Sequence, residues 1–183
     1  LTQLPRRLAI IGAGPIGLEM AQAFARFGSQ VTVFDIMPTM GGLRDPEGLA
    51  LVRTALEADG IQFCLESQTQ KVDVVGGEKV LTFTHAGETK TLAVDEILLA
   101  AGRRPNIEGL NLEAAGVAYS KKGVSVNDRM QTSNSAIFGA GDVAIPAQFT
   151  HTADATARIV LQNALFFGRK KYSNLIIPWT VYT

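Results

Sequence analysis

Three glycines near the start of the chain constrain its fold more than any other feature. Gly12, Gly14 and Gly17 form the pattern G-x-G-x-x-G. The apolar run 7–11 before them predicts a short buried strand, and residues 15–28 after them place apolar side chains at helical spacing. A strand, a glycine turn and a helix in this order begin a βαβ unit, which indicates an α/β fold with a parallel sheet.

The next strand completes a dinucleotide-binding pattern. Residues 30–35 alternate as a strand and end at Asp35, about 20 residues beyond the glycines, where a ribose-binding acid belongs. Glycines at this spacing let the backbone approach a pyrophosphate, and the helix N-terminus supplies N–H groups for it. Because a carboxylate repels a 2′-phosphate and no basic residue follows before Arg44, we expect NADH rather than NADPH.

In the middle of the chain the spacing of apolar residues changes from helical to alternating. Residues 45–60 predict a helix capped by Asp45, and residues 61–65 predict a strand. From 71 to 94 the pattern alternates with period two and is interrupted by "GGE" and "AGE", which predicts an antiparallel meander. Residues 96–102 return to a buried strand.

The last third predicts shorter elements. We expect a turn and a short helix over 103–116 and two short strands within 123–142. A helix capped by Thr150 is expected over 150–168, and a strand over 174–183. The predicted inner faces of the first and last helices are Ile16, Met20, Ala23, Phe24 and Phe27, and Ala157, Val160, Leu161 and Leu165, respectively.

Composition excludes several classes of function. Hydrophobic residues make up 46% and charged residues 19% of the 183 residues, which is ordinary for a globular chain. The net charge of zero gives no electrostatic basis for binding nucleic acid or a membrane surface, and no apolar run is long enough for a membrane span. One cysteine, Cys64, allows no internal disulfide and is expected to be a buried apolar residue. With only two histidines, His85 and His151, we expect no metal site, and we expect a reducing, cytoplasmic setting.

Two further strands end in glycine turns. They lie in "EILLAAGRRPN" (96–106) and "AIFGAGDVA" (136–144). Asp142 directly follows Gly141, so its carboxylate can accept hydrogen bonds from the hydroxyls of a sugar or polyol. Shortly after it, Thr150 begins a helix whose N-terminus can stabilise negative charge on a ligand. A ligand with a polyol and an electron-accepting ring would use both features.

Taken in order, these stretches resemble the FAD-dependent pyridine nucleotide–disulfide oxidoreductases, the family of dihydrolipoamide dehydrogenase, glutathione reductase and mercuric reductase. The likeness covers essentially the whole chain. It rests on "GAGPIGLE", the acid at 35, the meander, "LLAAGRRPN", "NLEAAGV", "IFGAGDVA", "QFTH" and "NLIIPWTVYT".

The resemblance implies an arrangement of domains. Residues 1–102 would form a Rossmann-like NAD(P)-binding domain with an antiparallel β-meander. Residues 103–173 would form the second part of an FAD-binding domain, and residues 174–183 the start of a dimerisation domain. The family's own FAD glycine loop and its redox dithiol are absent from the 183 residues. We therefore expect an internal part of a longer homodimeric flavoprotein, inactive by itself.

The resemblance also implies the cofactor sites. The NADH site would consist of Gly12, Ala13, Gly14, Pro15, Ile16, Gly17, Glu19, Asp35 and Gly102. The FAD site would consist of Gly141, Asp142, Gln148, Phe149, Thr150 and His151. Residue chemistry alone makes Glu19 a helix-surface acid, and the resemblance places it near the nicotinamide. Asp142 would bind the flavin ribityl or phosphate region. No catalytic residue is expected here, because the family's catalytic histidine belongs to the dimerisation domain.

The implied reaction transfers a hydride from the nicotinamide to flavin N5, and electrons then pass to a disulfide or similar acceptor. One alternative is an NADH oxidase or NADH:quinone reductase without the dithiol. Another is a nucleotide-binding module with no catalysis of its own. The segments "QFTHTADATARIV" and "IPWTVYT" are similar to the mercuric-reductase branch, which typically uses NADPH, whereas Asp35 favours NADH.

Overall fold

The computed structural model describes residues 2–41 and 45–183, so Arg44 lies outside the described residues. The chain forms two compact units, one of residues 1–102 with 180–183 and one of residues 103–179. Within the described ranges, no helix is both long and apolar enough to cross a membrane.

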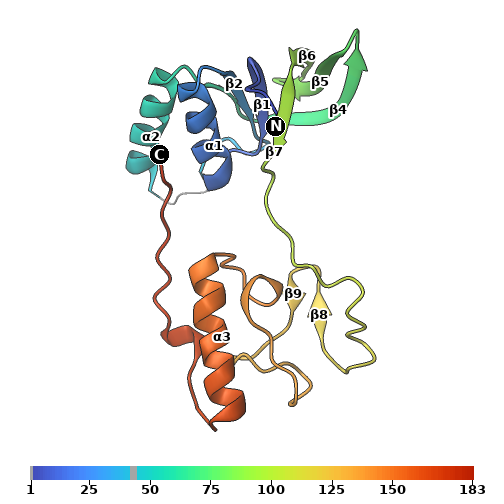
Figure 1. The fold of residues 1–183 in the computed structure, drawn as a ribbon, viewed down its shortest axis with the longest axis vertical. Coiled ribbons are helices and arrows are strands. Elements are labelled where there is room, and N and C mark those ends of the chain that lie inside the picture. Colours follow the sequence, from blue (N-terminus) through green and yellow to red (C-terminus); the bar gives the residue numbers. More distant parts are fainter. Residues whose placement is uncertain (1, 42–44) are drawn as a thin grey trace. The chain divides into compact units, whose positions relative to one another are not determined.

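Unit 1 is built on a four-stranded parallel sheet in the order β3-β2-β1-β7 (Figure 1). The strands are β1 (Arg7–Ile11), β2 (Gln30–Phe34), β3 (Gln62–Cys64) and β7 (Glu96–Leu99). The predicted βαβ start and the α/β fold are confirmed. Cys64 ends β3 as a half-buried free thiol, and β7 is less buried than predicted because Leu99 at its end is exposed.

Two helices follow the first two strands. Helix α1 (Pro15–Arg26) begins at the glycine loop, and α2 (Pro46–Ala58) begins at Asp45, whose carboxylate accepts the Glu47 N–H at 3.1 Å. Asp45 is therefore the predicted N-cap. Gly60, just past the end of α2, has a φ of +85°, a conformation that favours glycine after a helix.

The predicted meander is a separate three-stranded antiparallel sheet of β4 (Ser67–Val75), β5 (Glu78–His85) and β6 (Glu88–Val94). Two-residue loops join the strands, and all four loop residues have positive φ: Gly76, Gly77, Ala86 and Gly87. Positive φ at both positions is what a tight hairpin with the native strand twist requires, which explains the glycines at three of these four positions.

The parallel sheet is the middle layer of unit 1, with the helices on one face and the meander on the other (Figure 1). Alternate residues of β1 point to opposite faces. Leu8 and Ile10 pack in the cluster that contains Leu18 and Leu56 of the helices. Ala9 packs in the cluster with Phe34 and with Leu81, Phe83 and Val94 of the meander.

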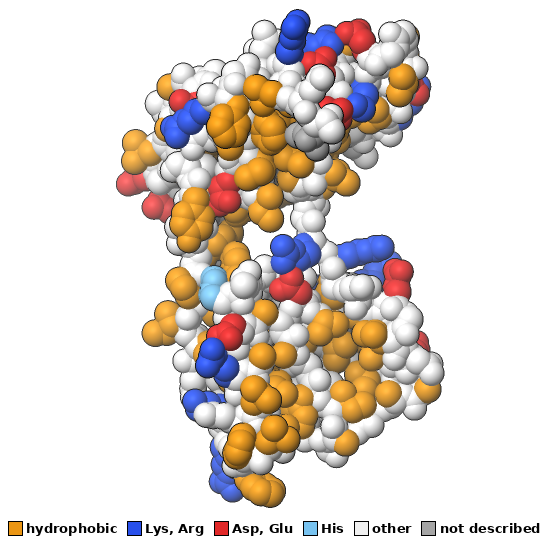
Figure 2. Space-filling model, in the orientation of Figure 1, with side chains coloured by type: hydrophobic (Ala, Val, Ile, Leu, Met, Phe, Trp, Pro, Cys, Tyr) orange, Lys and Arg blue, Asp and Glu red, His pale blue; other side chains and the backbone are white. Residues whose placement is uncertain are grey.

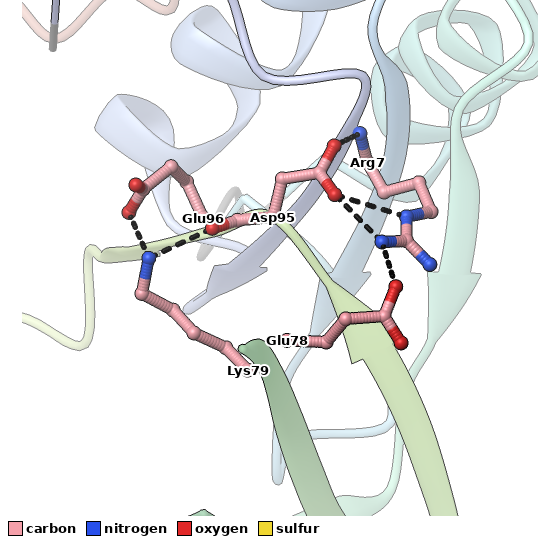
Figure 3. A network of polar contacts seen from close by, with 5 residues as sticks. All are labelled: Arg7, Glu78, Lys79, Asp95 and Glu96. Atoms are coloured by element: carbon pink, nitrogen blue, oxygen red, sulfur yellow. Dashed lines mark hydrogen bonds and ion pairs between the residues drawn. The ribbon is translucent and has the colours of Figure 1, made fainter. Parts of the chain in front are cut away.

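A polar network ties the meander to β1 (Figure 3). The Arg7 guanidinium contacts Asp95 at 2.6 Å and Glu78 at 2.7 Å, and the Arg7 backbone N–H donates to Asp95 at 2.8 Å. Lys79 pairs with Glu96 at 2.9 Å and donates to the Asp95 carbonyl. The hydrogen bonds from Arg7 lower the pKa of Asp95 below its ordinary value of 3.8. The network therefore links the β6–β7 connection to the first strand.

Unit 2 contains one long helix, α3 (Thr150–Leu165), packed on a set of turns. Its short elements are β8 (Tyr119–Ser120), β9 (Gly123–Val124) and the 3₁₀ turns η1 (Gly141–Val143) and η2 (Tyr172–Asn174). The core is small: Met130 and Ile145 pack against Ile159 of α3.

Three predicted elements are corrected. Residues 103–116 form turns rather than a helix, because Gly109, Asn111 and Gly116 have positive φ and interrupt any helical run. Residues 175–183 form no strand, since none of the described residues pairs with them. The strand expected before the second glycine turn is reduced to a single bridge between Gln131 and Phe138.

The predicted inner faces of both helices are also wrong in part. On α1 the buried residues are Gly17, Leu18, Ala21 and Gln22, and Ile16 and Phe27 are exposed. On α3 they are Thr152, Thr156 and Ile159, and Leu161 and Leu165 are exposed. Hydrophobic side chains accordingly reach the surface of both units on the face drawn in Figure 2.

Candidate functional site

The glycine loop between β1 and α1 is closed by contacts that only glycine allows. A Cβ on Gly12 would overlap the Ala100 carbonyl, and Gly12 has a φ of +112°. A Cβ on Gly17 would overlap the carbonyl of Gly12. These two glycines therefore let the loop, the helix and the end of β7 approach each other closely.

Gly14 has a different environment. A Cβ built on Gly14 meets no atom of the described residues within 4 Å, and its φ of −72° is accessible to any residue. Neither the backbone conformation nor the packing of the fold explains a glycine here. Open space beside a helix N-terminus is what an incoming phosphate needs, so the loop suits a bound pyrophosphate.

Among the described residues, no side chain occupies the N-terminus of α1. Gly14 is the N-cap, no described side chain caps the helix, and the first turn contains no acidic residue. Pro15 occupies the first turn and has no N–H to satisfy. The N–H groups at this end, including that of Ile16, thus remain available to an anion, and the helix dipole favours negative charge there.

Asp35 is anchored to this loop. One carboxylate oxygen accepts the Ala13 N–H at 2.6 Å and the other accepts the Met37 N–H at 2.9 Å. The sequence predicted the position of Asp35 but not this role in the loop. Because each carboxylate oxygen has two acceptor sites, both still have capacity for ligand hydroxyls.

A shallow pocket adjoins Asp35. It has a volume of about 360 Å³ and is lined by Ile36, Glu66, Ser67 and Gln68. The Ser67 N–H donates to the Asp35 carbonyl at 2.9 Å, which fixes the start of β4 next to the acid. Sequence reasoning missed this pocket, because it forms only where β4 returns to the end of β2.

Glu19 and Gly102 lie at other edges of the loop region. The Ala100 N–H donates to the Ile11 carbonyl at 2.7 Å, which holds Ala100 next to β1. Gly102 follows Ala100 by two residues, at the end of the same turn. The Glu19 carboxylate, half-buried on α1, accepts the Tyr182 N–H at 3.1 Å. This contact brings the end of the chain to Glu19, and no sequence pattern indicated it.

The second glycine turn is fixed by α3. The Gly141 N–H donates to the Thr156 hydroxyl at 3.0 Å, and Thr156 is fully buried. A Cβ on Gly141 would come within 3.0 Å of Ala153, and the φ of Gly141 is +67°. The turn therefore requires glycine both for its conformation and for its close contact with the helix.

Asp142 stands next in this turn with a partner that the sequence did not reveal. Arg103 Nη1 contacts Asp142 Oδ2 at 2.5 Å. The Gln148 side chain donates to the Asp142 carbonyl at 3.2 Å. Two of the predicted flavin-site residues, Asp142 and Gln148, are thus in direct contact.

The start of α3 contains the remaining candidates. Phe149 is the N-cap and Thr150 the first helical residue, so the predicted cap by Thr150 is wrong, and no side chain of the described residues caps this helix. His151 stacks on Phe149 with ring centroids 5.3 Å apart, and Trp179 lies 6.1 Å from Phe149. The N-terminus of α3 also has no acidic residue in its first turn, so it suits a partly negative ligand group.

Comparison with known proteins identifies the family of this chain. The family model described as pyridine nucleotide-disulphide oxidoreductase matches residues 1–158. The chain belongs to this family. Its members are flavoproteins that use pyridine nucleotides, so the resemblance read from the sequence is confirmed.

Individual relatives carry different activities. A dihydrolipoyl dehydrogenase of Thermus scotoductus is 37% identical over 188 aligned positions, which cover 98% of this chain and 39% of the relative. A mercuric reductase of Staphylococcus aureus is 35% identical over 184 positions, covering 100% of this chain and 34% of the relative. The chain thus spans less than half the length of these relatives.

Among solved structures, the HOCl-induced flavoprotein disulfide reductase RclA from Escherichia coli matches with a TM-score of 0.89 and 30% identity. The match covers 99% of this chain and 41% of that one. The fold of this chain is accordingly similar to that of a part of this flavoprotein disulfide reductase.

Proposed function

We propose that this chain contributes the NADH-binding unit and part of the FAD-binding unit of a longer flavoprotein oxidoreductase. In this proposal FAD accepts a hydride from NADH, and the electrons pass to a disulfide or similar acceptor. The family membership supports the reaction class. The observation that carries the assignment is the glycine loop, with its close contacts at Gly12 and Gly17 and its open space at Gly14.

The residues of unit 1 would bind and orient the dinucleotide. The pyrophosphate would lie over Gly14 at the N-terminus of α1, where free N–H groups and the helix dipole stabilise its charge. Asp35 would accept the adenosine ribose hydroxyls, and the pocket beside Ile36 would take the base. Glu19 would lie near the nicotinamide, at the point where Tyr182 reaches α1.

The residues of unit 2 would hold the flavin. Asp142 would accept hydrogen bonds from the ribityl chain, and the N-terminus of α3 would stabilise negative charge on the ring. Phe149 and His151 offer a stacked pair of rings beside that helix start. The residues that choose the final acceptor would be supplied by the rest of the protein.

The charge of Asp35 supports NADH over NADPH. A carboxylate at this position repels a 2′-phosphate, and Asp35 is already held in place by two backbone N–H groups. The test is a titration of the chain with NADH and with NADPH at the same ionic strength. We expect tighter binding of NADH. Equal binding, or tighter binding of NADPH, would overturn the preference, and binding of neither would overturn the proposed dinucleotide site.

The sequence of the full reading frame tests the remainder of the proposal. A second G-x-G-x-x-G with a nearby cysteine pair upstream of residue 1 is expected for a dithiol flavoprotein reductase. The same glycine loop without the cysteines would assign a flavin-only NADH oxidase or quinone reductase instead.

A further inference from the structure

An ion pair in unit 2 joins Arg103, its first residue, to the glycine turn that contains Asp142. Arg103 follows the turn that ends in Gly102, and its Nη1 lies 2.5 Å from Oδ2 of Asp142 in η1. The side chains are 52% and 36% exposed, respectively. Ion pairs at this level of exposure contribute little to stability, so stability alone does not account for the contact.

The backbone at Asp142 is fixed without this arginine. The Gly141 N–H is bound by the buried Thr156 hydroxyl, and the Asp142 carbonyl accepts from Gln148. The Thr156 hydroxyl in turn donates to the Thr152 carbonyl at 2.8 Å, inside α3. Arg103 therefore acts on the carboxylate of Asp142 and not on the shape of the turn.

Both members of the pair have unused hydrogen-bonding capacity. Among the described residues, Asp142 Oδ1 has no hydrogen-bond partner, and Arg103 contacts Asp142 through Nη1 alone. A guanidinium has five N–H donors and a carboxylate has about four acceptor sites. The pair thus presents a free carboxylate oxygen beside free N–H donors.

We propose that Arg103 is a positioning residue for Asp142. It holds Oδ2 so that Oδ1 faces a ligand hydroxyl, and it offsets a negative charge that would otherwise repel phosphate groups next to that hydroxyl. The ligand class that fits is a polyol joined to phosphate, as in a flavin nucleotide. This inference rests on the proposed flavin site.

The neighbouring arginine provides a matched control. Arg104 carries the same charge one residue away, but its side chain is 86% exposed and, in the part of the chain that the structure describes, pairs only with Glu108, at 3.6 Å. Among the described residues, Arg104 forms no hydrogen bond or ion pair with Asp142. Loss of Arg104 changes the net charge as loss of Arg103 does, without touching the pair.

The test uses the full-length protein, freed of flavin and titrated with FAD by fluorescence quenching. The Arg103→Gln variant is expected to weaken FAD binding by about 10- to 100-fold, the range for losing a charge-assisted contact. Arg103→Lys keeps the charge without the planar fork and is expected to recover part of the loss. Arg104→Gln is expected to stay within about twofold of wild type.

A double-mutant cycle separates positioning from a general structural effect. If Arg103 acts through Asp142, Arg103→Gln has little further effect on FAD affinity in an Asp142→Asn background. Additive losses, or an equal loss in Arg104→Gln, would overturn the inference. Arg103→Gln and Arg103→Lys that both bind FAD like wild type would also overturn it, leaving the flavin site intact. A wild-type protein that binds no FAD would instead overturn the proposed flavin site itself.

Discussion

The roles of two glycines in the first loop can be separated by the same substitution. Gly14→Ala places a methyl group in open space at an accessible φ of −72°. Replacing an N-cap glycine with alanine costs about 0.5–1 kcal/mol, and the lower entropy of the unfolded chain returns about 0.4–1 kcal/mol. The free energy of unfolding should therefore change by less than about 0.5 kcal/mol.

The effect of Gly14→Ala on ligand binding should be much larger. The methyl group would stand where the pyrophosphate approaches the N-terminus of α1, and it would displace the phosphate from the N–H groups. Losing one charge-assisted hydrogen bond costs about 1.5–3 kcal/mol, which weakens NADH binding about 10- to 100-fold.

Gly17→Ala should mainly lower the free energy of unfolding, whereas Gly14→Ala mainly weakens NADH binding. Its Cβ would overlap the Gly12 carbonyl, a backbone atom that has no rotamer with which to move away. Forcing extra atoms into a packed site costs about 1–3 kcal/mol, more than the roughly 1 kcal/mol that alanine gains over glycine inside a helix. For a unit of this size each kcal/mol lowers Tm by about 4–8 °C.

The assay is thermal unfolding by circular dichroism together with NADH titration of each variant. We expect the Gly14→Ala variant to have the Tm of wild type and to bind NADH poorly. We expect Gly17→Ala to melt at lower temperature. A Gly14→Ala variant with wild-type NADH affinity would contradict the role of Gly14 in phosphate binding. A Gly17→Ala variant as stable as wild type would contradict the role of Gly17 in packing.

Three further predictions concern stability. Because Arg7 lowers the pKa of Asp95 below 3.8 in the folded state, the pair stabilises the fold fully above that value and loses its contribution as pH falls through the lower folded pKa. In urea unfolding, the free energy of unfolding of Asp95→Asn should therefore fall less at acid pH than that of wild type. The same acid dependence in both proteins would contradict this role of the pair. Thr156→Val should leave the Gly141 N–H buried and unpaired at a cost of about 1–3 kcal/mol, whereas Thr156→Ser should keep most of the stability; equal urea midpoints for these two variants would argue against the hydrogen bond. Asp45→Ala should destabilise unit 1 by about 1 kcal/mol through loss of the α2 cap, and an unchanged melting temperature would count against that role.

The sequence predicted the elements whose signals are local. The βαβ start, the Asp45 cap and the meander with its two-residue turns all follow from spacing and turn residues within a short window. The glycine loop of Gly12 and Gly17 and the strand-end position of Asp35 could be predicted for the same reason, because the glycine pattern and the acid lie in one short unit.

The inner face of α1 could not be read from periodicity. Apolar residues occur nearly all round this helix, so the stripe of Ile16, Met20 and Phe27 fitted as well as the true one. The close approach of Gly17 to Gly12 determines which face of α1 is buried, since it turns Leu18 inward and leaves Ile16 exposed. On α3, the bond from Gly141 to Thr156 selects the face in the same way.

Contacts between residues far apart in the sequence also could not be predicted from it. Arg103 and Asp142 are 39 positions apart, and Glu19 and Tyr182 are 163 apart. Neither pair leaves a pattern in a local window. The short helix expected within 103–116 does not form, because helical spacing was read without the positive φ that Asn111 adopts in the turn.

In the function proposed above, this chain helps to pass a hydride from NADH to a bound flavin. The most direct test is to purify the full-length protein, measure its bound FAD, and add NADH in the absence of oxygen while following the visible absorbance of the flavin. We predict stoichiometric FAD and rapid bleaching by NADH. A protein without flavin, or a bound flavin that neither NADH nor NADPH bleaches, would contradict the account.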